Sequence, residues 1–473
     1  MTITAAPLAP HPDRLLPAEP GTRAVARRLY QAVRGLPIIS PHGHVDPRLL
    51  LDDQPFPDPA TLFVTPDHYV TRLLHANGVP LEQLGVGRGP LSEAEARGVW
   101  RQLCAHWPVF RGTPVRYWLE AELAEIFGVR VRPSAETADA VYDAVAERLG
   151  QDGYRPRALF DRFGISVLAT TDDPCDDLAT HAALAADPTW PHRVLPTFRP
   201  DRYLEPAAAD WAALVGRLGE VAGVDTGSYA GWVAAMEARR AYFRAHGAVS
   251  TDHSHEDVGT EPLDAADAER VYATALAGRV DPAAATALRR HMLLEMARMA
   301  TEDSLTMTLH PGVRRNHHRP TLAAFGPDTG HDIPLRAGFT DPLRPLLERF
   351  GTHPNLTLVL FTLDETAFSR ELAPLAGFYP SVYLGAPWWF LDAPDAARRF
   401  RRAVTETAGF AKTSGFVDDT RAFCSIPARH DMARRLDAGF LAGLVVEHRL
   451  DEDEALGTAV DLVVGRPTAV FGL

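Results

Sequence analysis

The sequence predicts an α/β fold, a (β/α)8 TIM-type barrel with an all-helical insertion after the first strand, from three observations. Short apolar runs alternate with stretches of helical periodicity from residue 164 onward, as in parallel sheets that helices cover. Together with a run at 38–39 they number eight, which is the strand number of such a barrel. Polar or aromatic residues follow nearly every run, as at the barrel end that carries active sites. A doubly wound open sheet is the alternative, but no glycine-rich phosphate turn follows any run.

The first strand is predicted in the segment LPIISPHGHVDP, residues 36–47, after a helix over 22–33. From 47 to 163 the periodicity is helical, with a capping box at Ser92 and Glu95 and a first-turn proline at Pro114. From residue 164 onward, short β-type runs alternate with stretches of helical periodicity. We therefore expect residues 1–46 to hold the N-terminal helix and strand one, 47–163 to form a helical insertion that contributes to the active site, and 164–473 to complete the barrel.

The other seven strands are predicted within the later part of the chain, each ending in side chains suited to catalysis or binding. They lie at 165–170, 193–198, 248–252, 305–310, 356–362, 382–386 and 415–418. The carboxyl ends of parallel strands meet at one end of a barrel, so the residues that follow the runs are expected to form one site.

Composition restricts the partners of the chain. It has 473 residues, 46% hydrophobic and 23% charged, with a net charge of −13 and no basic tract, so we expect no nucleic-acid partner. No run approaches the length of a membrane span, and the N-terminus lacks the pattern of a signal peptide. We expect a cytoplasmic protein without a membrane partner.

A lysine-dependent mechanism would have to use Lys412, the single lysine of the sequence.

A metal site is predicted where the first strand ends. His42 and His44 are two residues apart, so in a strand they share a face, and two neutral imidazoles suit a divalent transition metal. Strands one and eight are neighbours in a closed barrel, which makes Asp419 the expected carboxylate ligand, with Asp418 in a packing or supporting role. We expect one divalent metal, with zinc as the default. Strand six ends without a histidine and strand four offers no lysine, so no second metal is expected beside it. His310 is left open as a further ligand or a substrate contact.

Arginines at the strand ends indicate the charge of the substrate. Arg199, Arg315 and Arg421 follow three different predicted strands. A guanidinium fork pairs with a carboxylate through two hydrogen bonds. We therefore expect an anionic small-molecule substrate.

The chain resembles the uronate isomerase (glucuronate isomerase) family, a divergent branch of the amidohydrolase superfamily, over nearly its whole length. The similarity is carried by the HxH segment and by DHYVTRLL, LATTDDPCDDL, PTFRPD, STDH, HPGVRRN, GPDTGHD, PWWFLD and GFVDDTRAFCSIPARHD. It implies a distorted (β/α)8 barrel and interconversion of D-glucuronate with D-fructuronate and of D-galacturonate with D-tagaturonate. It also implies that His42, His44 and Asp419 bind metal.

The resemblance places further residues around the uronic acid, which are His68, Tyr69, Arg199 and Arg421. We add His310, Arg315 and Trp388 as substrate contacts. Isomerisation moves a proton between C2 and C1 through an enediol, which needs a base and a group that stabilises the oxyanion. The expected base is Tyr69, if a guanidinium such as Arg421 lowers its pKa, or Asp419, with Arg421 as the third catalytic residue.

Two other functions stay open at the level of the sequence. One is a metal-dependent hydrolase, a lactonase or deaminase on the same scaffold, although such a protein would usually carry a histidine after strand six. The other is a non-catalytic protein that binds a sugar acid. A homo-oligomer is expected for a barrel of this kind.

Overall fold

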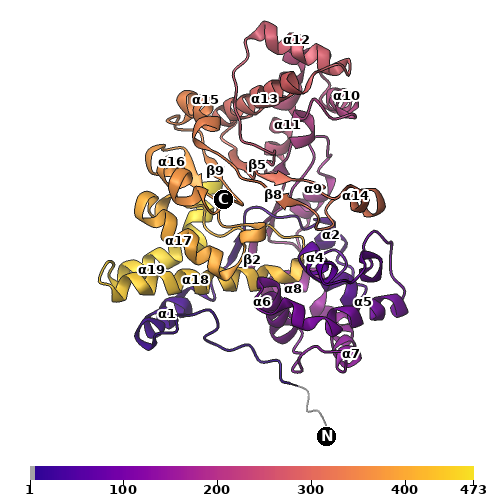
Figure 1. Ribbon diagram of the computed structural model, residues 1–473, viewed down its shortest axis with the longest axis vertical. Coiled ribbons are helices and arrows are strands. Elements are labelled where there is room, and N and C mark those ends of the chain that lie inside the picture. Colours follow the sequence, from indigo (N-terminus) through magenta and orange to yellow (C-terminus); the bar gives the residue numbers. More distant parts are fainter. Residues whose placement is uncertain (1–5) are drawn as a thin grey trace.

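The computed structural model, which describes residues 6–473, arranges helices around two parallel sheets (Figure 1). The first sheet has the strand order β1-β2-β3 and the second the order β10-β9-β6-β5-β4. Every strand pair in these sheets is parallel. The strands are β1 (Ile38–Ser40), β2 (Ile165–Ala169), β3 (Arg193–Leu195), β4 (Thr197–Phe198), β5 (Ser250–His253), β6 (Thr306–Leu309), β9 (Leu358–Leu360) and β10 (Val382–Leu384). The prediction of an α/β protein with parallel strands is confirmed.

The predicted strand at 193–198 is divided at Pro196 into β3 and β4. Proline has no backbone N–H and therefore cannot continue the hydrogen-bond ladder of a parallel strand. The two sheets still meet at this point, because Asp172 forms a parallel bridge with Phe198 and its N–H donates to the Thr197 carbonyl at 3.0 Å.

The prediction of an eighth strand at 415–418 is wrong, because these residues do not form a strand in the structure. The two residues before this stretch meet β10 only briefly: Thr413 forms an isolated parallel bridge with Leu384, and the Ser414 N–H donates to the Leu384 carbonyl at 2.9 Å. Gly415 then takes a φ of +77°, which turns the chain out of the extended conformation. Beyond it, the N–H of His44 donates to the carbonyl of Thr420 at 3.0 Å. The segment 413–420 therefore touches β10 on one side and the exit of β1 on the other without forming a ladder.

A small antiparallel hairpin follows β6 and was not predicted. Its strands, β7 (Val313–Arg314) and β8 (Ile333–Pro334), flank the helix α14 (Arg319–Phe325). Strands of two residues are too short to show an alternating pattern in the sequence.

Between β1 and β2 the described chain contains helices and no named strand. The Ser92 capping box is present, with the side chains of Ser92 and Glu95 each bonded to the other's backbone N–H, and Pro114 occupies the first turn of its helix as predicted. Trp100 and Phe63 pack in the core of this part. The helices are α2 (Arg48–Asp52), α3 (Pro59–Phe63), α4 (His68–Ala76), α5 (Glu93–Ala105), α6 (Pro114–Ala121), α7 (Ala138–Leu149) and α8 (Pro156–Phe163).

The remaining long helices alternate with the strands or close the chain. The predicted helix at 22–33 is α1 (Pro20–Val33), which packs against α18 (Ile426–Val446) and α19 (Glu452–Val460) in a separate apolar cluster. The others are α9 (Ala179–Ala186), α10 (Trp211–Ala222), α11 (Tyr229–Ala245), α12 (Ala265–Leu276), α13 (Pro282–Asp303), α15 (Thr340–Phe350), α16 (Ala373–Phe378), α17 (Pro394–Ala408) and α20 (Arg466–Phe471).

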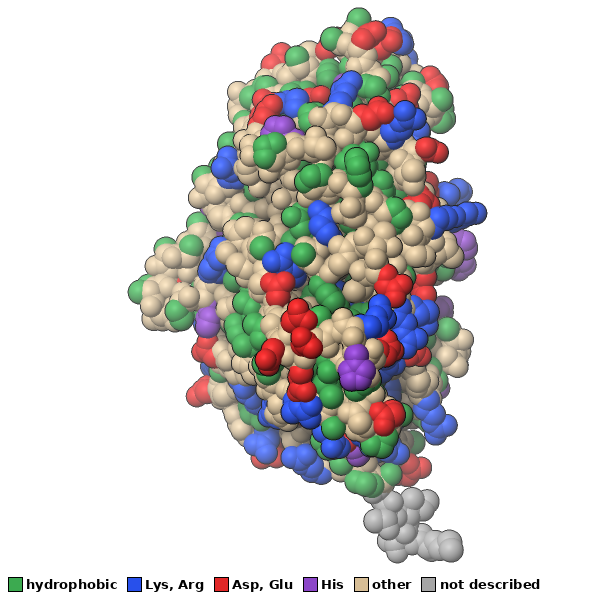
Figure 2. Space-filling model, turned by 90° about the vertical axis from the view of Figure 1, so that its left-hand side faces the viewer, with side chains coloured by type: hydrophobic (Ala, Val, Ile, Leu, Met, Phe, Trp, Pro, Cys, Tyr) green, Lys and Arg blue, Asp and Glu red, His purple; other side chains and the backbone are tan. Residues whose placement is uncertain are grey.

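The surface mixes both signs of charge. Figure 2 shows acidic and basic side chains spread over one face of the molecule, and ion pairs such as that of Arg28 with Glu452, 2.6 Å apart, join neighbouring helices. Within residues 6–473, no helix has both the length and the apolar character needed to cross a bilayer.

Replacing Leu358 by alanine tests how far the parallel sheet supports the fold. This side chain is fully buried in β9, between β6 and β10, and leaving a cavity there costs about 2–5 kcal/mol. We expect a clear drop in the urea midpoint of unfolding. Leu456→Ala on α19, at a position 38% exposed, is the control and should change stability by less than about 0.5 kcal/mol. Equal effects of the two variants would contradict the described core.

Candidate metal and substrate site

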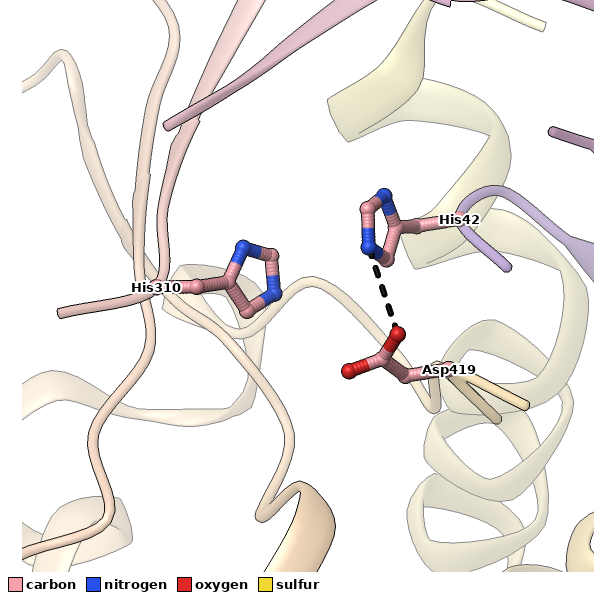
Figure 3. Close-up of side chains that lie close together, drawn as sticks. All are labelled: His42, His310 and Asp419. Carbon is pink, nitrogen blue, oxygen red and sulfur yellow. Dashed lines mark ion pairs between the residues drawn. The ribbon is translucent and has the colours of Figure 1, made fainter. Parts of the chain in front are cut away.

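The predicted metal ligands lie together at the exit of β1. The Nε2 atoms of His42 and His44 lie 3.3 and 2.9 Å from the same oxygen, Oδ1 of Asp419. The side chains of His42 and Asp419 are 2% and 7% exposed, and that of His44 is 29% exposed. Figure 3 shows His42 and Asp419 reaching the same space from chain segments far apart in the sequence.

The charges of these groups depend on one another. Burial opposes ionisation of Asp419, but hydrogen bonds from His42 and His44 outweigh it and hold its pKa well below the usual value. Burial also disfavours protonated His42, yet the carboxylates of Asp252 and Asp419 raise its pKa overall. For His44 burial prevails and lowers the pKa. Asp419 is therefore a carboxylate at neutral pH.

His310 comes to the same centre from the exit of β6. One ligand atom from each of His42, His310 and Asp419 lies within 4.8 Å of the other two, and the rings of His310 and His42 stack with their centroids 4.8 Å apart. The Nδ1 of His310 lies 2.6 Å from Oδ1 of Asp252. A carboxylate at one ring nitrogen leaves the other, Nε2, to face a ligand or a metal.

The residues at this centre fit a metal ion. Among the described residues, Nε2 of His310 is buried and has no hydrogen-bond partner, and the Nε2 atoms of His42 and His44 both lie against Oδ1 of Asp419. Buried polar atoms are normally satisfied, so an unpartnered imidazole nitrogen beside two further imidazoles and a carboxylate points to a bound group. Imidazole nitrogens with one carboxylate are a donor set that suits zinc and related divalent ions.

The backbone around the site is strained at several residues. Asp419, Trp389, Asn316 and Asp328 have φ values of +42°, +49°, +54° and +60°, in the left-handed region that residues other than glycine rarely adopt. Such conformations persist where the surrounding structure imposes them, and they gather at functional sites. Their presence in four separate segments indicates that these segments are shaped by the site they surround.

The first turn of α4 carries His68 and Tyr69 to the site. Asp67 caps this helix, because its side chain accepts a hydrogen bond from the Tyr69 N–H at 2.8 Å. The rings of His68 and Tyr69 stack 4.7 Å apart, and Trp389 lies beside His68 at 5.7 Å. Burial, with a smaller contribution from the Arg421 guanidinium, lowers the pKa of His68 to about 3. His68 is therefore neutral at physiological pH.

The arginine beside Tyr69 is Arg429 rather than Arg421. Its guanidinium carbon lies 4.7 Å from the centre of the Tyr69 ring, and it forms a buried ion pair with Asp392. Burial raises the pKa of the Tyr69 phenol despite this positive neighbour. The condition that we set for Tyr69 as a base, a pKa lowered by Arg421, is therefore not met in this geometry.

The predicted arginines lie around the centre, each beside a carboxylate. Nε of Arg199 is 2.8 Å from Oδ2 of Asp201, and neither of its terminal nitrogens donates a hydrogen bond to a described residue. Arg421 approaches Asp328, with Nη2 and Oδ2 separated by 3.5 Å. The guanidinium charges are thus held in place.

Arg315 and Trp388 border the site from the loops after β6 and β10. Arg315 is 37% exposed, contacts Asp332 at 3.3 Å and lies over the Trp389 ring at 4.9 Å. Trp388 packs edge-on against His310, with centroids 4.8 Å apart, and its buried Nε1 has no partner among residues 6–473. A buried indole N–H of this kind is a hydrogen-bond donor suited to a sugar hydroxyl.

Several residues at the site lie outside the predicted set of site residues. Asp252, Asp328 and Arg429 each contact a predicted site residue, and Asp392 pairs with Arg429. Asp252 lies in the STDH segment and Asp328 lies in GPDTGHD, so the motifs contained the signal. Arg429 likewise lies in GFVDDTRAFCSIPARHD, but nothing in that segment indicates that it, rather than Arg421, meets Tyr69. Asp418 pairs with His430 at 3.1 Å, and Lys412 donates to the carbonyls of Tyr379 and Pro380.

The parallel strands and the site define an α/β protein with a group of histidine and aspartate side chains, able to bind a metal, at the carboxyl ends of its strands. The comparisons with known proteins agree over the whole chain. The chain belongs to the glucuronate isomerase family, whose model matches residues 21–465.

Individual relatives support this assignment. The uronate isomerase of Cutibacterium acnes is 57% identical over 461 residues, which cover 98% of each chain. The crystal structure of glucuronate isomerase from Caulobacter crescentus superposes with a TM-score of 0.96 at 45% identity, covering 99% of this chain and 98% of that one. That of uronate isomerase from Thermotoga maritima gives 0.91 at 27% identity, covering 98% and 99%. The resemblance found in the sequence is confirmed, and the hydrolase alternative is not favoured.

Acidification should destabilise the chain in part through His68. The pKa of this ring is about 3 in the fold against 6.5 as a free side chain, so the unfolded chain binds the proton first. The contribution of neutral His68 is present above pH 6.5 and is lost as the pH falls toward 3. We expect His68→Asn to lose less stability than the parent between pH 8 and pH 5 in denaturant titrations. An identical loss would contradict the neutral, buried state of the ring.

Proposed function

We propose that this chain is a uronate isomerase that interconverts D-glucuronate with D-fructuronate and D-galacturonate with D-tagaturonate. The observation that carries the proposal is the meeting of His42, His44 and Asp419 inside a chain of the glucuronate isomerase family. The reaction moves a proton between C2 and C1 through an enediol, which requires a base beside the carbon acid.

In this proposal Asp419 is the base. Its pKa, held well below the usual value in this fold, keeps it ionised at neutral pH, so it can accept the proton from C2 and return it to C1. The hydroxyl proton of O2 moves to O1 in the same conversion, which leaves a ketone at C2 and an alcohol at C1. Tyr69, whose pKa burial raises, keeps its proton and donates a hydrogen bond to a substrate oxygen. Arg421 offers positive charge to the oxygen that becomes negative in the enediol.

The substrate carboxylate is assigned to the guanidinium groups of Arg199 and Arg315. Both are partly exposed, at 25% and 37% of the side chain, and both retain donors for a new acceptor. His68, His310 and Trp388 complete the contacts with the sugar. Neutral His68 and the indole N–H of Trp388 suit hydroxyl groups rather than the carboxylate.

The proposed cofactor is one divalent metal, zinc, held by His42, His44 and Asp419. When bound, it supplies positive charge that stabilises an oxyanion of the substrate. His310, whose free Nε2 faces the same centre, is a substrate contact in this arrangement.

We further propose that the eight segments form a distorted (β/α)8 barrel, in which residues 413–420 take the eighth place without a ladder. The strand order and the contacts of this segment with β10 and His44 support that arrangement. In the same proposal 1–46, 47–163 and 164–473 are the three parts of the chain, and 47–163 walls the site through His68 and Tyr69. We also propose a cytoplasmic homo-oligomer, which sedimentation of the purified chain would test.

Proton NMR of D-glucuronate with the zinc-loaded protein in D2O tests the reaction directly. We expect signals of the ketose to grow and deuterium to enter at the exchanging carbon. Unchanged glucuronate that nevertheless binds the protein would contradict isomerase activity and favour a sugar-acid binding protein.

The choice of base is tested by Asp419→Asn against Tyr69→Phe. Losing a general base costs about 100- to 10,000-fold in rate, so we expect the first variant to lose that much kcat and the second much less. The zinc content of each variant is measured alongside, since Asp419 is also a proposed ligand. A Tyr69→Phe variant that is as inactive as Asp419→Asn, with full zinc content, would contradict the assignment.

Arg315→Ala tests the carboxylate contact. A charged hydrogen bond contributes about 1.5–3 kcal/mol, so KM for glucuronate should rise by about 10- to 100-fold with a smaller change in kcat. Arg314→Ala removes the neighbouring arginine, which is 56% exposed and pairs with Glu256, and should leave KM near the parent value. Equal KM values for the two variants would remove Arg315 from the substrate contact.

A further inference from the structure

A second group of metal-ligating side chains lies beside the centre described above. One ligand atom from each of Asp201, His253 and His255 lies within 4.8 Å of the other two. His253 is the last residue of β5, and Asp201 begins a 3-10 helix just after β4. These strands are neighbours, so the cluster forms at the same end of the sheet as the first centre, yet it shares no residue with it.

His255 has the arrangement of a metal ligand. Its side chain is 2% exposed, and Nδ1 lies 2.8 Å from Oε1 of Glu205. Donation of the Nδ1 proton to a carboxylate leaves the lone pair on Nε2 and fixes the orientation of the ring. Among the described residues Nε2 has no hydrogen-bond partner, and it lies 3.6 Å from Oδ1 of Asp201.

His253 adds a second buried imidazole. The residue is 1% exposed, and its Nδ1 has no hydrogen-bond partner within residues 6–473, while Nε2 lies 3.3 Å from the hydroxyl of Thr251. Neutral imidazole is the form that binds metal ions.

The charges around the cluster also suit a cation. Oδ2 of Asp201 pairs with Arg199, while Oδ1 faces His255 and accepts the Ser254 N–H at 3.0 Å. The carboxylate of Glu205 lies on the far side of His255. One ligand atom from each of the three side chains thus lies within 4.8 Å of the others, and each of the two imidazoles has a ring nitrogen without a partner among the described residues. The one guanidinium in contact with Asp201 occupies its other oxygen.

We propose that Asp201, His253 and His255 bind a second divalent cation of the zinc class, and that Glu205 orients His255 for it. Two imidazoles and one carboxylate are a common zinc donor set, which leaves a further position for water. The sequence led us to expect a single metal, because strand six lacks a histidine and strand four lacks a lysine. The predicted strand four is β5, and its exit supplies two histidines to the cluster in place of a lysine, while Asp201 comes from the exit of β4.

Metal content tests the proposal without relying on isomerase activity. The full chain is stripped with a chelator, loaded with zinc, desalted and analysed by mass spectrometry for zinc per chain. We expect two equivalents for the parent and one for His255→Gln. His42→Asn should lose the other equivalent, and the double variant should retain none. One equivalent in the parent, or two in His255→Gln, would overturn the second site.

Two further variants guard against indirect effects. His291→Gln removes another buried histidine, on α13, whose Nδ1 accepts the Leu263 N–H at 3.1 Å, and it should keep two equivalents. Glu205→Gln changes a side chain that is 44% exposed, so it should fold normally. Loss of such an orienting carboxylate lowers metal affinity by about 10- to 100-fold, which a cobalt titration followed by visible absorption would measure. An unchanged affinity would contradict the role of Glu205.

Discussion

The contact of His42 and His44 with one oxygen of Asp419 is the interaction on which the rest of the site depends. It joins the exit of the first strand to a residue near the end of the chain, 3.3 and 2.9 Å away. The backbone supports the same junction through the His44 N–H and the Thr420 carbonyl. Asp419 itself takes a left-handed conformation there. Backbone strain of this kind persists only where surrounding contacts impose it, which agrees with a position selected for chemistry.

A chain of paired charges surrounds this junction. His310 contacts Asp252, Asp252 lies 3.4 Å from Arg199, and Arg199 pairs with Asp201. Buried charges are costly unless they are paired and hydrogen-bonded. The network therefore holds the Arg199 guanidinium between two carboxylates in a fixed position, so that its charge meets an anion without reorganisation. Its last member, Asp201, belongs to the cluster for which we propose the second cation.

Much of this arrangement could be predicted from the sequence, because the determining patterns are local. The β-type runs gave seven of the strand positions, with one divided at Pro196, and the HxH spacing placed two imidazoles on one side. The meeting of His42 and Asp419 was expected because the first and last strands are adjacent in a closed barrel. The family resemblance implied the same pair of ligands. These expectations needed only strand order and side-chain direction.

The parts that escaped prediction depend on tertiary contacts. Residues 415–418 have the composition of a strand, but the left-handed turn at Gly415 fits against Leu462 and Pro467 near the C-terminus. The arginine that meets Tyr69 comes from α18, so its choice over Arg421 is a matter of helix packing. Likewise, Glu205 is an unremarkable acidic residue until the fold sets it against His255.

Anomalous X-ray scattering at the zinc edge, from crystals of the zinc-loaded chain, tests the central claim most directly. The account predicts a peak within bonding distance of His42, His44 and Asp419, with Asp419 still in its left-handed conformation. A loaded crystal in which zinc lies away from these three residues, or in which Asp419 does not contact it, would contradict the account.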